Sequence, residues 1–218
     1  MELLEADNLL FNSGPGGLAR RVSFKLRPGT VVWLRGPSGH GKTSLLRTLA
    51  RLARPLGGEL RLDGTSWSEV PAMTWRSRVA YLHQKAVLFP GTVRSNLEKA
   101  FTLQIRRSRR LDRHQAEADL SHLKLPGDIL DRDALTLSTG EASRVALVRT
   151  LMVDPQILLL DEPSAALDPQ ARCALGALLA RWVSEFRRGI IGAGHDEELM
   201  RQVPGHEIHL ARLEPVNR

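Results

Sequence analysis

Two uninterrupted runs of apolar residues stand out against the otherwise mixed pattern of the chain, at Thr30–Leu34 and Gln156–Leu160. Short continuous apolar runs are typical of strands that are buried on both faces of a parallel sheet. Parallel strands are joined by crossover connections, which are usually helices, so we expect a helix after each run. The pattern therefore predicts an α/β core built on a parallel sheet.

The first part of the chain has a different pattern, with short alternating runs over residues 2–27 on either side of the segment Asn12–Gly17. Alternation of this kind predicts half-buried strands, and the glycines and proline between them predict a turn. A further strand of the same type is expected at Glu59–Gly64. We therefore predict an antiparallel β-subdomain at the N-terminal end of the fold.

Residues 86–150 have helix-like periodicity, which is interrupted at Pro90-Gly91 and at Pro126-Gly127. This pattern predicts a helical subdomain entered and left through loops. From Pro169 onward we expect a long helix, a short strand at Ile190-Ile191 and polar helical residues. A chain of 218 residues without an internal repeat is predicted to form a single domain, residues 1–218, with the helical subdomain inserted at roughly 86–150.

Composition argues against a membrane-spanning or exported chain. Hydrophobic residues make up 42% and charged residues 25% of the sequence, and no segment approaches the roughly 18 apolar residues that a membrane-spanning helix needs. The first residues are acidic where a secretory signal would be basic. The single cysteine, Cys173, has no partner for an internal disulfide and is expected to be a packed helix residue. We therefore expect a cytoplasmic protein.

The net charge of +7 invites a nucleic-acid hypothesis, with the densest basic cluster at Arg106, Arg107, Arg109 and Arg110. These arginines do not form a helical stripe with interleaved aromatic residues, so a solvated surface is favoured. Contact with anionic lipid headgroups or with a membrane subunit remains the alternative. No nucleic-acid partner is expected.

The strongest chemical signal is a glycine-rich octapeptide between the first apolar run and a helical stretch that begins with Ser44. Its residues are Gly36, Pro37, Ser38, Gly39, His40, Gly41, Lys42 and Thr43. Glycines allow successive backbone N–H groups to point at phosphate oxygens, and the positive end of the helix dipole adds to this attraction. Lys42 is placed to reach the terminal phosphates, and the Thr43 hydroxyl is placed to bind magnesium. The segment therefore predicts a phosphate-binding loop.

Two carboxylates, Asp161 and Glu162, follow the second apolar run directly. Parallel strands end at a common edge of the sheet, where phosphates bind in folds of this type. We expect Asp161 to hold the magnesium shell and Glu162 to polarise, or accept a proton from, an attacking water. In isolation, the two acids could also be no more than the start of a loop.

A third motif, Leu137–Glu141, is a polar turn that opens a helix and would be weak evidence alone. In sequence order with the phosphate-binding loop and the acid pair, it resembles the nucleotide-binding subunits of ABC transporters, whose signature motif is LSGGQ. The resemblance extends from Phe11 to roughly Asp196. It implies a P-loop NTPase core with a parallel sheet, an N-terminal antiparallel β-subdomain and a helical subdomain that carries the signature turn.

The resemblance also implies roles for four residues that would be inconspicuous alone. Gln84, after a strand, would contact magnesium or water and sense the membrane subunit. Asp168 would lie in the loop that crosses a dimer interface, and His195 would be the switch histidine. The aromatic side chain that stacks on adenine is expected at Phe11, although a core phenylalanine is an equal alternative.

The implied mechanism requires two copies of the chain, ATP and Mg²⁺. The phosphate-binding loop of each copy would face the signature turn of the other, where Ser138 and the backbone of Gly140 would supply donors to the terminal phosphate. A separate multi-span membrane permease would be the partner. Two residues depart from the pattern, Thr139 in place of a glycine and Glu141 in place of a glutamine, and Thr139 would be strained if its position required a positive φ.

The stretch Leu88–Leu97 resembles the LF-x-GT-V-x-x-N segment of many ABC exporters, and the compact helical lobe is similar to a subgroup linked to metal, notably iron, efflux. Export is therefore favoured, although the ATPase subunit itself does not bind the cargo. A DNA-repair or chromosome ATPase is disfavoured. That class inserts long coiled coils or zinc modules between the phosphate-binding loop and the signature motif, and this sequence contains neither. A non-hydrolysing module that uses nucleotide as a clamp is the remaining alternative, and Thr139 lends it some weight.

Overall fold

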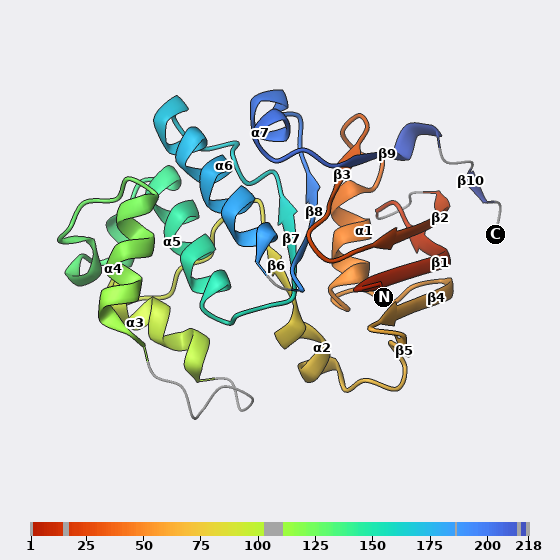
Figure 1. The fold of residues 1–218 in the computed structure, drawn as a ribbon, viewed down its shortest axis with the longest axis horizontal. Coiled ribbons are helices and arrows are strands. Elements are labelled where there is room, and N and C mark those ends of the chain that lie inside the picture. The colour runs from red at the N-terminus through yellow and green to blue at the C-terminus, as the bar shows by residue number, and fades with distance from the viewer. Residues whose placement is uncertain (1, 15–17, 103–110, 186, 213–214, 217–218) are drawn as a thin grey trace.

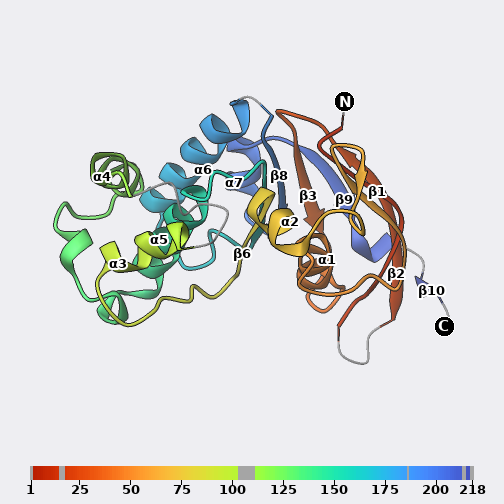
Figure 2. The ribbon, with the colours of Figure 1, turned by 90° about the horizontal axis from the view of Figure 1, so that it is seen from below.

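The computed structural model describes residues 2–14, 18–102, 111–185, 187–212 and 215–216. Within these residues the strands form two five-stranded sheets, with the orders β6-β7-β8-β3-β9 and β10-β2-β1-β4-β5. Helix α1 (Lys42–Leu49) lies between the two sheets, and helices α3 to α6 lie on the opposite side of the first sheet (Figures 1 and 2). The predicted α/β architecture, with a parallel sheet, an antiparallel sheet and a helical part, is confirmed.

The first sheet is parallel throughout its described strand pairs. Its strands are β3 (Val31–Arg35), β6 (Val79–Leu82), β7 (Ile157–Asp161), β8 (Gly189–Ala193) and β9 (His206–His209). Every residue of β7 and β8 is buried, as the continuous apolar run in β7 predicts. The expected helices follow, α1 after β3 and α6 (Pro169–Ser184) after β7. The edge strand β9 was not predicted.

The second sheet is antiparallel. Its strands are β1 (Leu4–Asn12), β2 (Ala19–Leu26), β4 (Gly57–Leu62), β5 (Thr65–Ser66) and β10 (Pro215–Val216). Strand β1 pairs with β2 on one side and with β4 on the other, so the predicted antiparallel strands are confirmed. Of the glycine-rich turn between β1 and β2, residues 15–17 lie outside the described residues. The inner face of this sheet packs on α1 in one buried cluster that also contains Trp75 of helix α2 (Ala72–Arg78).

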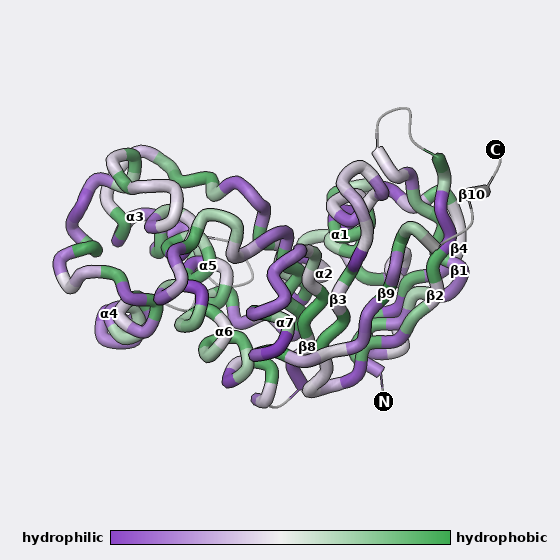
Figure 3. The backbone as a smooth tube through the Cα atoms, turned by 90° about the horizontal axis from the view of Figure 1, so that it is seen from above, coloured by the Kyte–Doolittle hydropathy of each residue, from purple (hydrophilic) through white to green (hydrophobic). Residues whose placement is uncertain are grey.

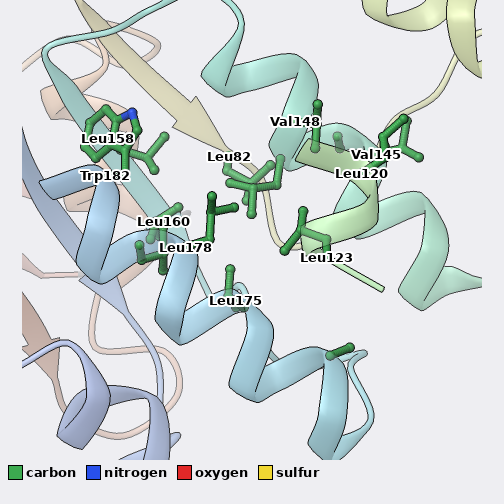
Figure 4. Close-up of a cluster of buried hydrophobic side chains, with 14 of the residues drawn as sticks. Leu82, Leu120, Leu123, Val145, Val148, Leu158, Leu160, Leu175, Leu178 and Trp182 are labelled. Carbon is green, nitrogen blue, oxygen red and sulfur yellow. The ribbon is translucent and has the colours of Figure 1, made fainter. Parts of the chain in front are cut away.

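The helical lobe consists of α3 (Val93–Glu98), α4 (Arg113–His122) and α5 (Thr139–Leu151), with 3₁₀ turns at Lys99–Phe101, Ile129–Asp131 and Ala134–Thr136. Both Pro-Gly pairs lie in loops, as predicted. A continuous hydrophobic cluster joins this lobe to the parallel sheet and to α6 (Figure 4). It includes Leu120, Val145, Leu160, Leu175 and Trp182. The lobe is therefore held against the sheet by shared packing rather than by a flexible link.

Strand β8 is rich in glycine for a packing reason. A Cβ on Gly192 would overlap the ring of Trp33, and a Cβ on Gly189 would lie 2.8 Å from a methyl group of Leu26. Trp33 is itself buried and donates a 2.9 Å hydrogen bond from Nε1 to the carbonyl of Val203. The short glycine-rich strand thus makes room for a large core side chain on its neighbour.

Three surface expectations have different outcomes. Cys173 lies on α6 but is exposed, so the expectation of a packed residue is wrong. The cluster at residues 106–110 lies outside the described residues. In the described part of the chain, none of the helices combines the length and apolar character that crossing a membrane requires. Along the tube in Figure 3, apolar stretches are short and alternate with polar ones.

After α6, the chain adds α7 (Glu197–Gln202) and a 3₁₀ turn at Leu210–Arg212.

Candidate active site

The glycine-rich loop connects β3 to α1, as its position in the sequence predicts. Gly36, Gly39 and Gly41 have φ values of 141°, 80° and 91°, which L side chains rarely adopt. Gly41 is also crowded, because a Cβ there would lie 2.9 Å from Ser13. No side chain caps the first turn of α1, and no acidic residue lies in it. The amide groups at this helix end are thus available to an anion such as a phosphate.

Lys42, the first residue of α1, is buried beside the loop with only 7% of its surface exposed. Its Nζ donates to the carbonyls of Gly36 and Pro37 at 2.5 and 3.2 Å and lies 3.3 Å from Nε2 of His195. Burial lowers the pKa of Lys42, and the nearby carboxylates of Glu162 and Asp161 oppose this shift. The ammonium group is therefore fixed between the loop and His195, whose Nε2 serves as an acceptor in this contact.

Asp161, at the end of β7, is 3% exposed and receives two hydrogen bonds. Thr43 donates from its hydroxyl to Oδ1 at 3.2 Å, and Tyr81 donates from its phenol to Oδ2 at 2.9 Å. A buried carboxylate without partners would be costly, so these two donors explain why it can be accommodated here. The Thr43 hydroxyl and the Asp161 carboxylate thus form an oxygen pair next to Lys42.

Glu162 lies one residue further on, where the chain turns sharply with φ of 48°. Its backbone N–H donates to the carbonyl of Ala193 on β8 at 2.8 Å. The side-chain amide of Gln84 donates to Oε2 of Glu162 at 3.0 Å. Gln84 follows β6, Glu162 follows β7 and His195 follows β8. These three strands are parallel neighbours, so their carboxyl ends place the three side chains on the same side of the site. The structure therefore brings Gln84, Lys42, Thr43, Asp161, Glu162 and His195 together.

This arrangement can bind a phosphate chain and a divalent cation and can deprotonate a water molecule. Hydroxyl and carboxylate oxygens suit Mg²⁺, which is usually held by one or two carboxylates together with the phosphates of the substrate. Among the described residues there is no group of three His, Cys, Asp or Glu side chains that would form a metal cage by itself. The pair Thr43 and Asp161 thus fits magnesium bound jointly with a nucleotide.

The signature turn lies at the start of α5 and is stabilised within its own chain. Ser138 caps the helix by accepting from the backbone N–H of Glu141 at 3.2 Å, and Glu141 Oε2 accepts from the N–H of Ser138 at 2.9 Å, which forms a capping box. Glu141 also pairs with Arg132 at 3.0 Å. Hydrogen bonds with the backbone and then the side chain of Ser138 chiefly lower the pKa of Glu141, with a smaller contribution from Arg132.

Thr139 is exposed at the first position of α5 and is not among the residues with positive φ. The backbone strain that a positive φ would cause at this position is therefore absent. The close approach occurs at Gly140 instead, where a Cβ would lie 2.8 Å from the carbonyl oxygen of Ala166. Asp168, two residues after Ala166, caps α6 by accepting from the N–H of Ala171 at 2.8 Å, and this bond lowers the pKa of Asp168. The turn thus contacts the Asp168 loop of its own chain, and its hydrogen bonds do not reach the phosphate-binding loop.

The structure contradicts the adenine-stacking prediction for Phe11. This residue is fully buried in β1, with its ring close to Gly41, so it has no face on which a base could stack. The alternative, a core phenylalanine, is what the structure has. Ser13, two residues further along the chain, also lies against Gly41, and its hydroxyl donates to the carbonyl of Leu18 at 2.7 Å. Tyr81 was missed, because no motif signals its contact with Asp161.

The chain is similar to known proteins in both sequence and fold. Residues 19–165 match the family model described as ABC transporter. Over 196 residues the chain is 34% identical to the probable iron export ATP-binding protein FetA of Escherichia coli strain K12, covering 90% of this chain and 86% of that protein. Over 197 residues it is 38% identical to the phosphate import ATP-binding protein PstB 2 of Natronomonas pharaonis, covering 84% of this chain and 67% of that protein. The fold matches a dimeric ATP-binding cassette solved in a post-hydrolysis state with ADP and Pi, with a TM-score of 0.81, 22% identity and 99% of both chains covered.

Proposed function

This chain belongs to the ABC transporter family as an ATP-binding, ATP-hydrolysing subunit, and from that premise we propose that two copies close around two MgATP molecules and drive a separate multi-span membrane permease. The observation that carries the proposal is the meeting of Lys42, Asp161 and Glu162 at one edge of the parallel sheet, beside a glycine loop with free helix N–H groups. The permease would hold the subunit on the inner face of the cell membrane.

Binding of ATP is assigned to the loop of Gly36 to Ser44, whose amides would surround the phosphates while the Lys42 ammonium contacts the terminal ones. Mg²⁺ would be held by Thr43, Asp161 and Gln84 together with the phosphates. When bound, it offsets the negative charge that develops on the phosphate oxygens. The 3.2 Å contact between the Thr43 hydroxyl and Asp161 supports this assignment.

Glu162 is the proposed general base. It would accept a proton from water as the water oxygen attacks the γ-phosphorus and the bond from that phosphorus to the bridging oxygen of ADP breaks. The hydrogen bond from Gln84 holds the carboxylate, and the contact between His195 and Lys42 places an imidazole beside the terminal phosphate. The products are ADP and inorganic phosphate.

The dimer is proposed because the site is incomplete in one chain. The terminal phosphate needs donors on its open side, and the signature turn that could supply them, Ser138 to Glu141, does not bond to its own phosphate-binding loop. Ser138 and Thr139 are exposed, and Asp168 lies at the exposed start of α6. A second copy can therefore present Ser138 and the N–H of Gly140 to the nucleotide.

The proposed contact with the permease is a groove of about 500 Å³ between β6 and the helical lobe, beside the Gln84 loop. Phe89 lines it with 44% of its surface exposed, and Lys99 and Arg149 lie over its ring at 4.9 and 5.4 Å. Val87 nearby is 60% exposed. Large exposed apolar side chains of this kind mark a surface that is covered by a partner.

Export is the favoured direction of transport, and a metal ion is the favoured cargo. It is supported by the segment Leu88–Leu97 and by the name of the bacterial relative, an iron export protein. Import is the second candidate, because a relative of similar identity is named as a phosphate import protein. Vesicles that contain the permease with this subunit on the outside would decide: ATP-driven accumulation of metal inside them supports export, and ATP-driven release of preloaded cargo supports import.

Phosphate release by the purified protein tests the enzyme itself. Glu162→Gln should lower the rate by about a hundredfold or more, since general bases contribute 10²–10⁴-fold. In saturating ATP the same variant should elute as a dimer in gel filtration. Glu117→Gln, at a half-buried position on α4, is the matched control and should leave the rate unchanged. Equal, measurable rates for Glu162→Gln and the unaltered protein would refute Glu162 as the general base, and no phosphate release by the unaltered protein would favour a nucleotide clamp.

A further inference from the structure

Tyr81 contacts the candidate magnesium site from a strand that carries no recognised motif. It lies in β6, which forms the edge of the parallel sheet opposite β9, and it pairs in register with Leu159 of β7. Two residues after Leu159, β7 ends at Asp161, and the Tyr81 phenol donates to Oδ2 of that carboxylate at 2.9 Å. The sheet register therefore sets this contact between residues that are distant in sequence.

The two oxygens of Asp161 have different neighbours. Oδ1 accepts from the hydroxyl of Thr43, which is the other oxygen of the candidate magnesium pair, and Oδ2 accepts from Tyr81. A carboxylate that is 3% exposed has little water to complete its hydrogen bonding, so the phenol is its available partner on the far side. With Oδ2 engaged by Tyr81, the carboxylate is held with Oδ1 toward Thr43.

Resting on the function proposed above, we propose that Tyr81 is a positioning residue for the magnesium site, because its hydroxyl fixes the rotation of the Asp161 carboxylate so that Oδ1 faces Thr43. Outer partners that orient a metal-binding side chain commonly contribute 10–100-fold to metal affinity. Tyr81 acts through Asp161 and touches neither the phosphate-binding loop nor Glu162 by any hydrogen bond of its side chain.

A further observation fits this role. The ring meets His83 edge-on, with centroids 5.8 Å apart and an interplanar angle of 78°. Packing therefore holds the ring, and the hydroxyl is presented to Asp161 in one orientation.

The test measures metal binding rather than turnover. In the Glu162→Gln background with ATP present, binding of Mn²⁺ as a spectroscopic substitute for Mg²⁺ is titrated by electron paramagnetic resonance. Tyr81→Phe removes one oxygen atom and should weaken Mn²⁺ binding by about tenfold or more, whereas ATP binding in EDTA should change by less than about twofold. Ser77→Ala is the matched control, because it removes another buried hydroxyl, one that bonds to the carbonyl of Thr74 in α2, and should leave both affinities unchanged.

A double-mutant cycle separates positioning from general packing. In an Asp161→Asn background, Tyr81→Phe should have little further effect, because the carboxylate that it orients is absent. Equal losses in Tyr81→Phe and Ser77→Ala, no loss in Tyr81→Phe, or a Tyr81→Phe protein that does not fold would each overturn the proposal. If the unaltered background binds no Mn²⁺ with ATP, the proposed MgATP function fails instead, which is a distinguishable result.

Discussion

Glu141→Ala removes a carboxylate that holds the signature turn at two points. The side chain accepts from the backbone N–H of Ser138 at 2.9 Å and from Arg132 at 3.0 Å. A hydrogen bond of the first kind contributes about 0.5–1.5 kcal/mol. The ion pair adds only about 0.2–1 kcal/mol, since its side chains are 35% and 19% exposed. The free energy of unfolding should therefore fall by about 1–2 kcal/mol.

For a chain of this length, 1 kcal/mol corresponds to roughly 2–4 °C in Tm, so Glu141→Ala should lower the Tm by about 2–8 °C. Thermal unfolding followed by circular dichroism without nucleotide measures this. Glu141→Gln keeps a neutral acceptor for the Ser138 N–H and loses only the ion pair, so its Tm should fall by about half as much or less. Glu117→Ala breaks an exposed pair with Arg113 and serves as the control, with a change near 1 °C.

The effect should depend on pH. Because hydrogen bonds from Ser138 chiefly lower the pKa of Glu141 in the folded chain, its carboxylate adds stability above its unfolded pKa, near 4.3. This stability is lost as the pH falls through the lower folded pKa. The difference in Tm between the unaltered protein and Glu141→Ala should thus be constant above about pH 5 and shrink below about pH 4. The reasoning would be refuted if Glu141→Ala lowered the Tm no more than Glu117→Ala does, or if the full difference in Tm persisted below about pH 4.

Two glycine substitutions test packing at other points. Gly192→Ala places a methyl group against the ring of Trp33 and should cost about 1–3 kcal/mol of stability, whereas Gly127→Ala, which meets open space, should be nearly neutral in thermal unfolding. Gly140→Ala places a methyl group 2.8 Å from the carbonyl of Ala166, so it should reduce ATP-dependent dimerisation in gel filtration while leaving nucleotide binding by the monomer intact. Normal dimerisation of that variant would contradict the close approach described for the signature turn.

The sequence by itself determined the parts of the site that are made of consecutive residues. The glycine loop between β3 and α1 and the acid pair after β7 can be recognised from a few consecutive residues. The glycines that give the backbone its freedom, the start of the helix and the side chains that carry the chemistry all lie within those residues. The uninterrupted apolar runs determined the central strands for the same reason, since a strand buried on both faces needs no polar residue. The signature turn was predicted only through its resemblance to the family motif, and its capping box of Ser138 and Glu141 was first seen in the structure.

Tertiary structure decided whatever depends on residues that are far apart in the chain. The burial of Phe11 and the position of Ser13 follow from how β1 packs on α1, and the alternating pattern alone could not say which residues meet Gly41. The contact of Lys42 with His195 and that of Tyr81 with Asp161 arise from the order and register of β6, β7, β8 and β3. Strand pairing over such distances is set by the packing of the whole core, so no local pattern in the sequence contains it.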